Sequence, residues 1–283
     1  MSTACKLVAG VGDLVMLPEA YVRIQSLLAD PNTGMEDFAR AVQSDPALTA
    51  RVLRIANSAL FGVSRRVDTV TLALGLMGIS RLHDLVLATA VIGSLARLPV
   101  PGIDLNAFWR RSIHTGITAR MLAAESGIFD SERLFATGLL HDIGHLVMYL
   151  RVPQQAEAAR LRSLADSVPL HLAERELLGF HYGDVGAELM ASWSFPDSLQ
   201  ELCRFHPEPQ RAPRHPRECS LLHIARHCVL RGDPDPETLA FLPGVSPSTL
   251  EHSKLGAAAV ARVESASYQH LIEAVELMLP KRA

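Results

Sequence analysis

Apolar residues recur at helical spacing along almost the whole chain, and this periodicity constrains the fold more than any other feature. One clear case follows Asp45 and Pro46, which suit the N-cap and the first position of a helix. Leu48, Val52 and Ile55 then recur at helical intervals and predict one buried helix face. No run of residues alternates in the manner of a half-buried strand. The sequence therefore predicts an all-α fold.

Capping residues, prolines and glycines predict where further helices begin and end. We expect short helices over Pro18–Leu28 and Met35–Val42. Side chains that can cap a following helix are Ser80, Asp104 and Ser131, and the helix after Ser131 is expected to include residues 141 and 142. Prolines that suit a first helical turn are Pro153, Pro196 and Pro216, and glycines that suit a helix end are Gly179 and Gly232.

Proline-rich breaks divide the helices into blocks. Pro99, Pro101 and Gly102 separate a first block of about five helices from a second block. Another break, over residues 233–247, precedes a C-terminal pair of helices. In this tail the spacing of Leu271, Ile272, Val275 and Leu279 fits packing against either the same chain or another.

Charge and cysteine content exclude several classes of protein. The net charge is -3 and the isoelectric point is about 6.5, which argues against nucleic-acid binding. The four cysteines show no CxxC spacing and are typical of reduced thiols. The longest uncharged apolar run, Leu85–Ala96, is too short to span a bilayer, and the first residues lack the apolar core of a signal peptide. We expect a cytoplasmic protein with no membrane insertion.

The pair His141 and Asp142 lies inside an apolar run, residues 138–147. A run this apolar belongs in a core, and burying an imidazole beside a carboxylate costs several kcal/mol unless both find partners. The sequence therefore predicts a metal, a charged partner or a hydrogen-bond network at this point.

An ordered set of motifs resembles the HDOD family of bacterial signalling domains, which are related to HD phosphohydrolases and HD-GYP phosphodiesterases. The motifs are Leu17-Pro18, Asp45–Leu48, Arg54–Ala59, Leu74–Gly78, Phe108–Ser112, Gly138–Gly144, His181–Leu189 and Trp193–Pro196. The resemblance implies an all-α HDOD domain over residues 14–231. It would comprise an N-terminal helical bundle (14–100) and a degenerate HD-like helical subdomain (101–231). A linker and a helical tail would follow over 232–283.

The resemblance also implies a set of candidate metal ligands. HD enzymes hold divalent metals with a histidine, the His-Asp pair, and later histidine and aspartate ligands. His141 and Asp142 match the pair, and His181 and His206 stand where HD-GYP relatives keep further histidines. Such ligands suit iron, manganese or zinc, which activate a bound water molecule. In an active site Asp142 would be the candidate catalytic carboxylate.

Two of the implied ligand positions hold arginines, Arg111 and Arg226. Arginine stays cationic and cannot ligate a metal. Its guanidinium could instead pair with Asp142 and take the place of the metal. The favoured interpretation is therefore a vestigial site without a cofactor, in which His141 and Asp142 form a hydrogen-bonded remnant. His181 and His206 could equally be capping or surface residues.

Other histidines leave alternatives open. His114 stands three residues after Arg111, on nearly the same helix face, and could replace the missing ligand. His223 and His227 form an i,i+4 pair, and His145 completes a His-Asp-x-x-His sequence. For all four the favoured interpretation is a partly exposed helical histidine.

Three functional hypotheses follow. The first is a non-catalytic signalling module that contacts sensor kinases, regulators or cyclic-dinucleotide enzymes, and the two arginines favour it. The second is a metal-dependent phosphohydrolase or phosphodiesterase acting on a nucleotide or cyclic dinucleotide. The third is a sensor that binds a nucleotide without turnover, with Arg111 and Arg226 on the phosphates.

Overall fold

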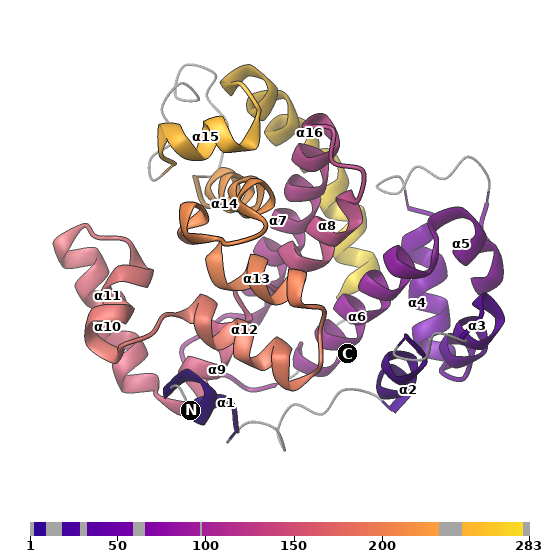
Figure 1. The fold of residues 1–283 in the computed structure, drawn as a ribbon. Coiled ribbons are helices and arrows are strands. Elements are labelled where there is room, and N and C mark those ends of the chain that lie inside the picture. The colour runs from indigo at the N-terminus through magenta and orange to yellow at the C-terminus, as the bar shows by residue number, and fades with distance from the viewer. Residues whose placement is uncertain are drawn as a thin grey trace.

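The computed structural model describes residues 3–9, 19–28, 33–58, 66–96, 98–231 and 245–279. Every regular element in these ranges is a helix, so the predicted all-α fold is confirmed. Figure 1 shows a group of N-terminal helices on one side of the molecule and a larger helical body on the other. Two residues at predicted helix ends, Pro18 and Gly232, lie outside the described residues.

The smaller group contains five helices that follow one another in the chain. They are α2 (Glu19–Leu28), α3 (Met35–Gln43), α4 (Pro46–Ala56), α5 (Val70–Met77) and α6 (Ile79–Leu95). The side chain of Asp45 accepts hydrogen bonds from the backbone N–H groups of Ala47 and Leu48, so the predicted start of α4 is confirmed. The preceding helix α1 (Thr3–Ala9) is separate from this group and packs against the larger body, on α12 and α9.

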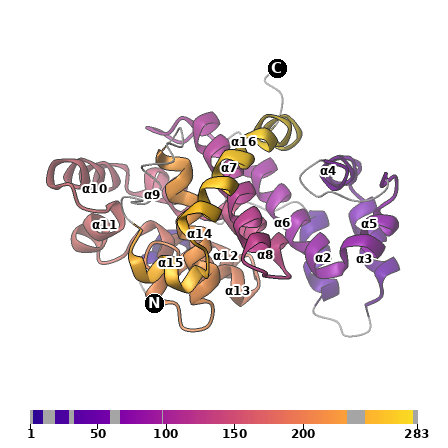
Figure 2. The same cartoon turned by 90° about the horizontal axis from the view of Figure 1, so that it is seen from above.

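The larger body is built on the long helix α7 and the helices that surround it. Its helices are α7 (Leu105–Glu125), α8 (Ser131–Leu140), α9 (Ile143–Arg151), α10 (Pro153–Asp166), α11 (Leu170–Leu178), α12 (Tyr182–Ser192), α13 (Asp197–Phe205), η1 (Pro209–Arg211) and α14 (Pro216–Arg231). Asp104 caps α7 as predicted, through Asn106 and Ala107. Helices α10 and α11 form a hairpin at one end of the molecule, opposite α2–α5, in both Figure 1 and Figure 2.

Three predicted helix starts are corrected. Helix α6 already begins at Ile79, because Gly78 adopts φ +82 and turns the chain directly from α5 into α6, so Ser80 lies inside the helix. Ser131 is the first residue of α8, after Asp130. Pro196 precedes the first turn of α13 rather than lying in it.

The C-terminal tail packs on the same chain. It consists of α15 (Pro247–Ser253), which contacts α14, and α16 (Ala257–Met278), which lies along α7 and also contacts α4 and α14. Leu271, Val275 and Leu279 pack against the core, whereas Ile272 is exposed. The tail therefore covers the domain, the first of the two arrangements that its sequence allowed.

Glycines allow two pairs of helices to approach closely around the centre of the body. A Cβ atom on Gly138 of α8 would lie 2.5 Å from the Cα of Gly116 in α7. A Cβ atom on Gly144 of α9 would lie 1.9 Å from the carbonyl oxygen of Tyr182 in α12. These contacts fix α8 and α9 against their neighbours and so position the two residues between them.

No single helix in the described ranges is long and apolar enough to cross a membrane. Helices α5 and α6 meet the length and composition test only as a pair, across a bend of 118°.

Candidate functional site

His141 and Asp142 lie at the junction of two helices rather than inside one. Helix α8 ends at Leu140 and α9 begins at Ile143, so the predicted single helix through both residues is wrong. The exposed fraction of His141 is 2%. Successive side chains in one α-helix point in different directions, but at this junction the two side chains meet. His141 Nε2 lies 3.3 Å from Asp142 Oδ2.

His206, the C-cap of α13, completes a group of three. Its Nε2 atom lies 3.9 Å from Asp142 Oδ1. Within the described part of the chain, His141, Asp142 and His206 are the one group of three potential ligands whose donor atoms all lie within 4.8 Å of one another. The helix junction and the end of α13 therefore bring together three of the residues selected from the sequence.

Backbone carbonyls orient both imidazoles. His141 Nδ1 donates to Gly138 O at 2.7 Å, and His206 Nδ1 donates to Cys203 O at 2.8 Å. Because a carbonyl oxygen only accepts, Nδ1 carries the proton, and a neutral ring then has its lone pair on Nε2. Metal-binding histidines are commonly oriented in this way. The orientation of the rings is thus compatible with metal binding.

Arg226 of α14 contacts the carboxylate of this group. Its Nε atom lies 3.3 Å from Asp142 Oδ1, and its guanidinium carbon lies 5.4 Å from the ring centre of Tyr182. Burial raises the pKa of the Asp142 carboxyl, but Arg226 and His141 outweigh burial and hold that pKa well below its ordinary value. Asp142 is therefore an anion with a fixed organic cation beside it.

The second arginine occupies a different environment. Arg111 is exposed on α7, and it makes no ion pair with any residue that the structure describes. Its charge contributes only a small lowering of the pKa of His145. Of the two arginines selected from the sequence, Arg226 alone contacts the group.

His114 and His181 lie apart from the group of three. His114 is buried under α16, with Nε2 2.8 Å from Ser267 Oγ and its ring against Tyr268. His181 caps α12, because its Nδ1 atom accepts a hydrogen bond from the backbone N–H of Gly183 at 3.0 Å. The partly exposed state expected for His114 is wrong, since α16 covers it. The same expectation is wrong for His223, which is buried and donates from Nδ1 to His206 O.

A buried acid–base pair adjoins the group, and sequence reasoning missed its acid. Glu174 of α11 accepts a hydrogen bond from the backbone N–H of Tyr182 at 2.9 Å, and its other oxygen lies 3.6 Å from His145 Nδ1. Burial raises the pKa of Glu174 to about 8 and lowers the pKa of His145 to about 4. One feature of the sequence could have identified it. Glu174 stands four residues from both Leu170 and Leu178, a spacing that places it on the inner face of α11.

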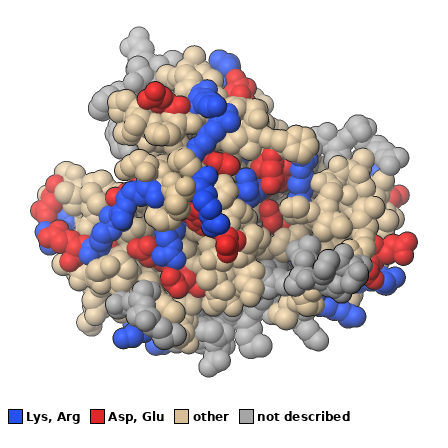
Figure 3. Space-filling view, viewed as in Figure 1, with Lys and Arg blue, Asp and Glu red and all other residues tan. Residues whose placement is uncertain are grey.

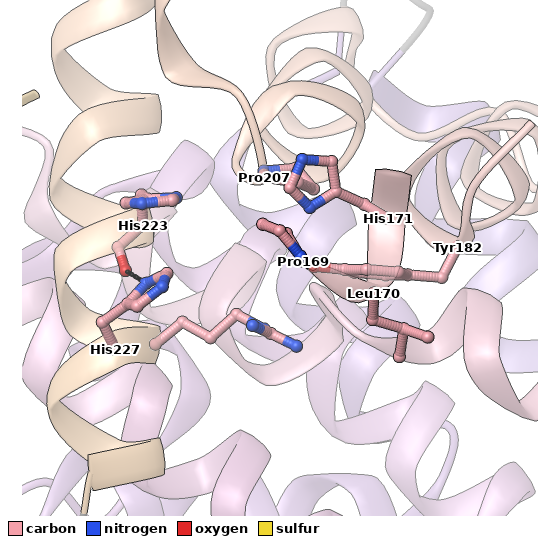
Figure 4. A pocket seen from close by; sticks show the side chains of 8 residues that line it. Pro169, Leu170, His171, Tyr182, Pro207, His223 and His227 are labelled. Carbon is pink, nitrogen blue, oxygen red and sulfur yellow. Dashed lines mark hydrogen bonds between the residues drawn. The ribbon is translucent and has the colours of Figure 1, made fainter. Parts of the chain in front are cut away.

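A cavity of about 200 Å³ lies next to the group formed by His141, Asp142 and His206. Arg226 and Tyr182, which contact that group, also line the cavity. Figure 4 shows His223 and His227 on one side of it and His171 and Tyr182 on the other. The complete lining is Pro169, Leu170, His171, Tyr182, Pro207, His223, Arg226 and His227.

A helical body with a His-Asp pair at a helix junction defines an HD-related class of domain. Within this class, the model of the HDOD domain matches residues 14–209, and the chain belongs to the HDOD family. The predicted extension of the domain to residue 231 remains a prediction.

Solved structures share this fold. A candidate phosphohydrolase of Shewanella amazonensis SB2B is 28% identical, with a TM-score of 0.76 over 98% of both chains. An HDOD domain protein of unknown function from Geobacter sulfurreducens is 21% identical, with a TM-score of 0.73 over 98% of this chain and 99% of that one. Among curated proteins, an uncharacterised protein of Treponema pallidum (strain Nichols) is 25% identical over 214 residues. That match includes 74% of this chain but spans only 40% of the Treponema protein.

Proposed function

We propose that this protein is a non-catalytic, cytoplasmic module of bacterial signal transduction that acts through contacts with other proteins. Its partners would be sensor kinases, regulators or cyclic-dinucleotide enzymes. The observation that carries the proposal is the ion pair between Arg226 and Asp142, in the middle of the residues that would hold a metal.

A divalent ion does not fit beside this ion pair. Asp142 is the only carboxylate in the group of three, and its charge is already balanced by Arg226. A metal ion bound to His141, Asp142 and His206 would be repelled by the adjacent guanidinium, which cannot lose its proton. We therefore expect no resident iron, manganese or zinc.

The surface supports a role in protein contacts. Five large apolar side chains on the α10–α11 hairpin are exposed: Leu161, Leu164, Val168, Leu172 and Leu177. By contrast, Figure 3 shows acidic and basic side chains interspersed over one face of the molecule, with no large area of a single sign. Several large apolar side chains exposed on one helical hairpin favour a binding surface, whereas mixed charge is typical of ordinary solvated surface.

Metal content is the test of this proposal. We expect chain purified without chelator or affinity-tag metal to hold far less than one metal ion per molecule by mass spectrometry. With added manganese it should not hydrolyse bis(4-nitrophenyl) phosphate. The variant Arg226→Asp should gain measurable manganese affinity, because it replaces the one arginine that contacts the group with a carboxylate ligand. Arg204→Asp, which alters an arginine bound to Asp184 and Glu188 instead, is the matched control.

The outcome that contradicts the proposal is stoichiometric metal in the wild-type chain that Asp142→Ala abolishes. Failure of Arg226→Asp to bind manganese would contradict the narrower idea that Arg226 takes the place of the metal.

A metal-dependent phosphohydrolase is the second candidate. The orientation of His141 and His206 favours it, because both rings donate from Nδ1 and keep Nε2 within 4 Å of the Asp142 carboxylate. In that case Arg226 would have to leave the carboxylate when the metal binds.

A further inference from the structure

We infer that the cavity between α11 and α14 binds a protonated phosphate group, either free phosphate or a small phosphomonoester. This site is distinct from the group of three ligands, from which Arg226 and Tyr182 separate it. The inference does not depend on the proposed contacts with proteins.

Asp142 balances the charge of Arg226, so the hydrogen-bond donors of the lining, rather than a net charge, favour an oxyanion. Arg226 is the one residue of the lining with a permanent charge, and the lining contains no carboxylate. The bond between Arg226 Nε and Asp142 Oδ1 fixes the guanidinium. Its Nη1 and Nη2 atoms make no hydrogen bond within the part of the chain that the structure describes. Two neighbouring terminal nitrogens of this kind match the spacing of oxygens on a phosphate group.

The first turn of α11 adds backbone donors to the same wall. Pro169, Leu170 and His171 line the cavity where the helix begins, and no side chain caps this helix. The backbone N–H groups of Leu170 and His171 make no hydrogen bond among the described residues. Free N–H groups at a helix N-terminus are favourable to anions. These donors reinforce the preference that Arg226 establishes.

His227 supplies an acceptor, and this atom distinguishes between oxyanions. Its Nδ1 donates to His223 O at 2.9 Å, so in the neutral ring Nε2 is an acceptor. Burial lowers the pKa of His227 to about 3, which keeps the ring neutral at pH 7. Hydrogen phosphate carries a P–OH group at pH 7 that can donate to this atom, whereas a phosphomonoester, with a second pKa of about 6, carries one only in its monoanion. Sulfate carries none, so the site should discriminate against sulfate.

The size and the remaining walls fit a small organic substituent. A volume of about 200 Å³ exceeds the roughly 30 Å³ that one water molecule occupies in the liquid. Pro169, Leu170 and Pro207 offer apolar surface, and Tyr182 offers a ring already stacked on His145. A phosphomonoester with a flat group would bury that group here.

Isothermal titration calorimetry of the full chain at pH 7 tests the inference. The probes are sodium phosphate, sodium sulfate and adenosine monophosphate, at matched ionic strength in a buffer free of phosphate. Phosphate should bind about tenfold or more tightly than sulfate. Tighter binding of adenosine monophosphate than of phosphate would identify a phosphomonoester as the ligand class. The reverse order would identify free phosphate as the ligand.

Variants locate the binding. Arg226→Lys should weaken phosphate binding about tenfold, because a single ammonium cannot bond Asp142 and the anion with the same geometry. Leu170→Trp should fill the cavity and abolish binding while leaving Asp142 and Arg226 untouched. His227→Leu should bring the phosphate and sulfate affinities together. Arg175→Lys, a guanidinium of α11 bound to Glu208 outside the cavity, is the matched control and should bind as the wild type does.

Three results would overturn the inference. They are no binding of either phosphate probe, equal binding of phosphate and sulfate by the wild type, and unchanged phosphate binding in folded Leu170→Trp protein. Circular dichroism checks that each variant is folded.

Discussion

At the scale of single residues, burial decides the chemistry of the ionisable groups near the site. With ordinary pKa values, Glu174 would be charged at pH 7 and His145 would be charged only in part. Here both are neutral at pH 7, because burial raises the pKa of the acid to about 8 and lowers that of the base to about 4. Asp142 remains charged in the same region because Arg226 and His141 compensate for its burial.

The raised pKa of Glu174 predicts a particular pH dependence of stability. Between the ordinary value of 4.5 and about 8, the folded state holds a proton that the unfolded state has lost. The contribution of Glu174 is therefore fully present below pH 4.5 and declines as pH rises through 8. The variant Glu174→Gln imitates the neutral acid at every pH. Its stability relative to wild type should increase by about 1.4 kcal/mol per pH unit from pH 5.5 to 7.5.

Urea unfolding of both proteins at several pH values measures this difference. Glu176→Gln, an exposed neighbour on α11 paired with Arg162, serves as the control and should show no such trend. Parallel stability curves for Glu174→Gln and wild type would show that Glu174 is ionised in the folded protein.

At the scale of helices, close crossings hold the junction that presents His141 and Asp142. Helix α8 approaches α7 through Gly138 and Gly116, and α9 approaches α12 through Gly144. Each crossing brings backbone against backbone, so the position of the junction depends on the absence of side chains at these points.

Replacement of Gly138 by alanine should therefore be destabilising. The new methyl group would lie 2.5 Å from the Cα atom of Gly116, and a backbone atom cannot move aside as a flexible side chain can. We expect a loss of about 2–3 kcal/mol in the free energy of unfolding, measured by urea denaturation. Gly75→Ala in α5 is the matched control, because nothing lies within 4 Å of its new Cβ atom. This control should gain about 0.5–1 kcal/mol from higher helix propensity. Similar effects of the two variants would contradict the proposed close crossing.

At the scale of the whole molecule, both ends of the described chain are tied to the larger body, and one hairpin projects from it. Helix α1 packs on α12 and α9, and α16 covers α7. The α10–α11 hairpin packs mainly on itself and on α9, at the end of the molecule opposite α2–α5. It is also where exposed apolar side chains gather.

We expect this hairpin to be the surface that a protein partner covers. The double variant Leu164→Glu, Leu172→Glu should fold as the wild type does, because both side chains are exposed. Its affinity for a protein partner captured by the wild type should fall about tenfold or more. The two new glutamates would be buried in the interface without compensating charges. Affinity capture followed by titration of the identified partner measures the loss. The exposed pair Arg40→Glu, Arg54→Glu on α3 and α4 is the control.

Equal affinity of the wild type and the hairpin variant would contradict the assignment of this surface. A wild-type dimer that the same substitutions dissociate, measured by light scattering, would assign the hairpin to self-association instead.

The sequence by itself determined the helical class, several helix boundaries and the family. Helix periodicity and capping act over three or four residues, so Asp45 and Asp104 could be placed at helix starts without knowledge of the rest of the chain. The order of the HDOD motifs is likewise a property of the linear sequence, and the family match confirms it.

Only the tertiary structure decided which side chains meet. Arg226 reaches Asp142 across 84 positions of sequence, whereas Arg111 remains exposed. His114 contacts Ser267 because α16 folds back over α7, and Glu174 is neutral because α11 buries it against Tyr182. No local pattern records these contacts, since each depends on how helices distant in sequence pack together.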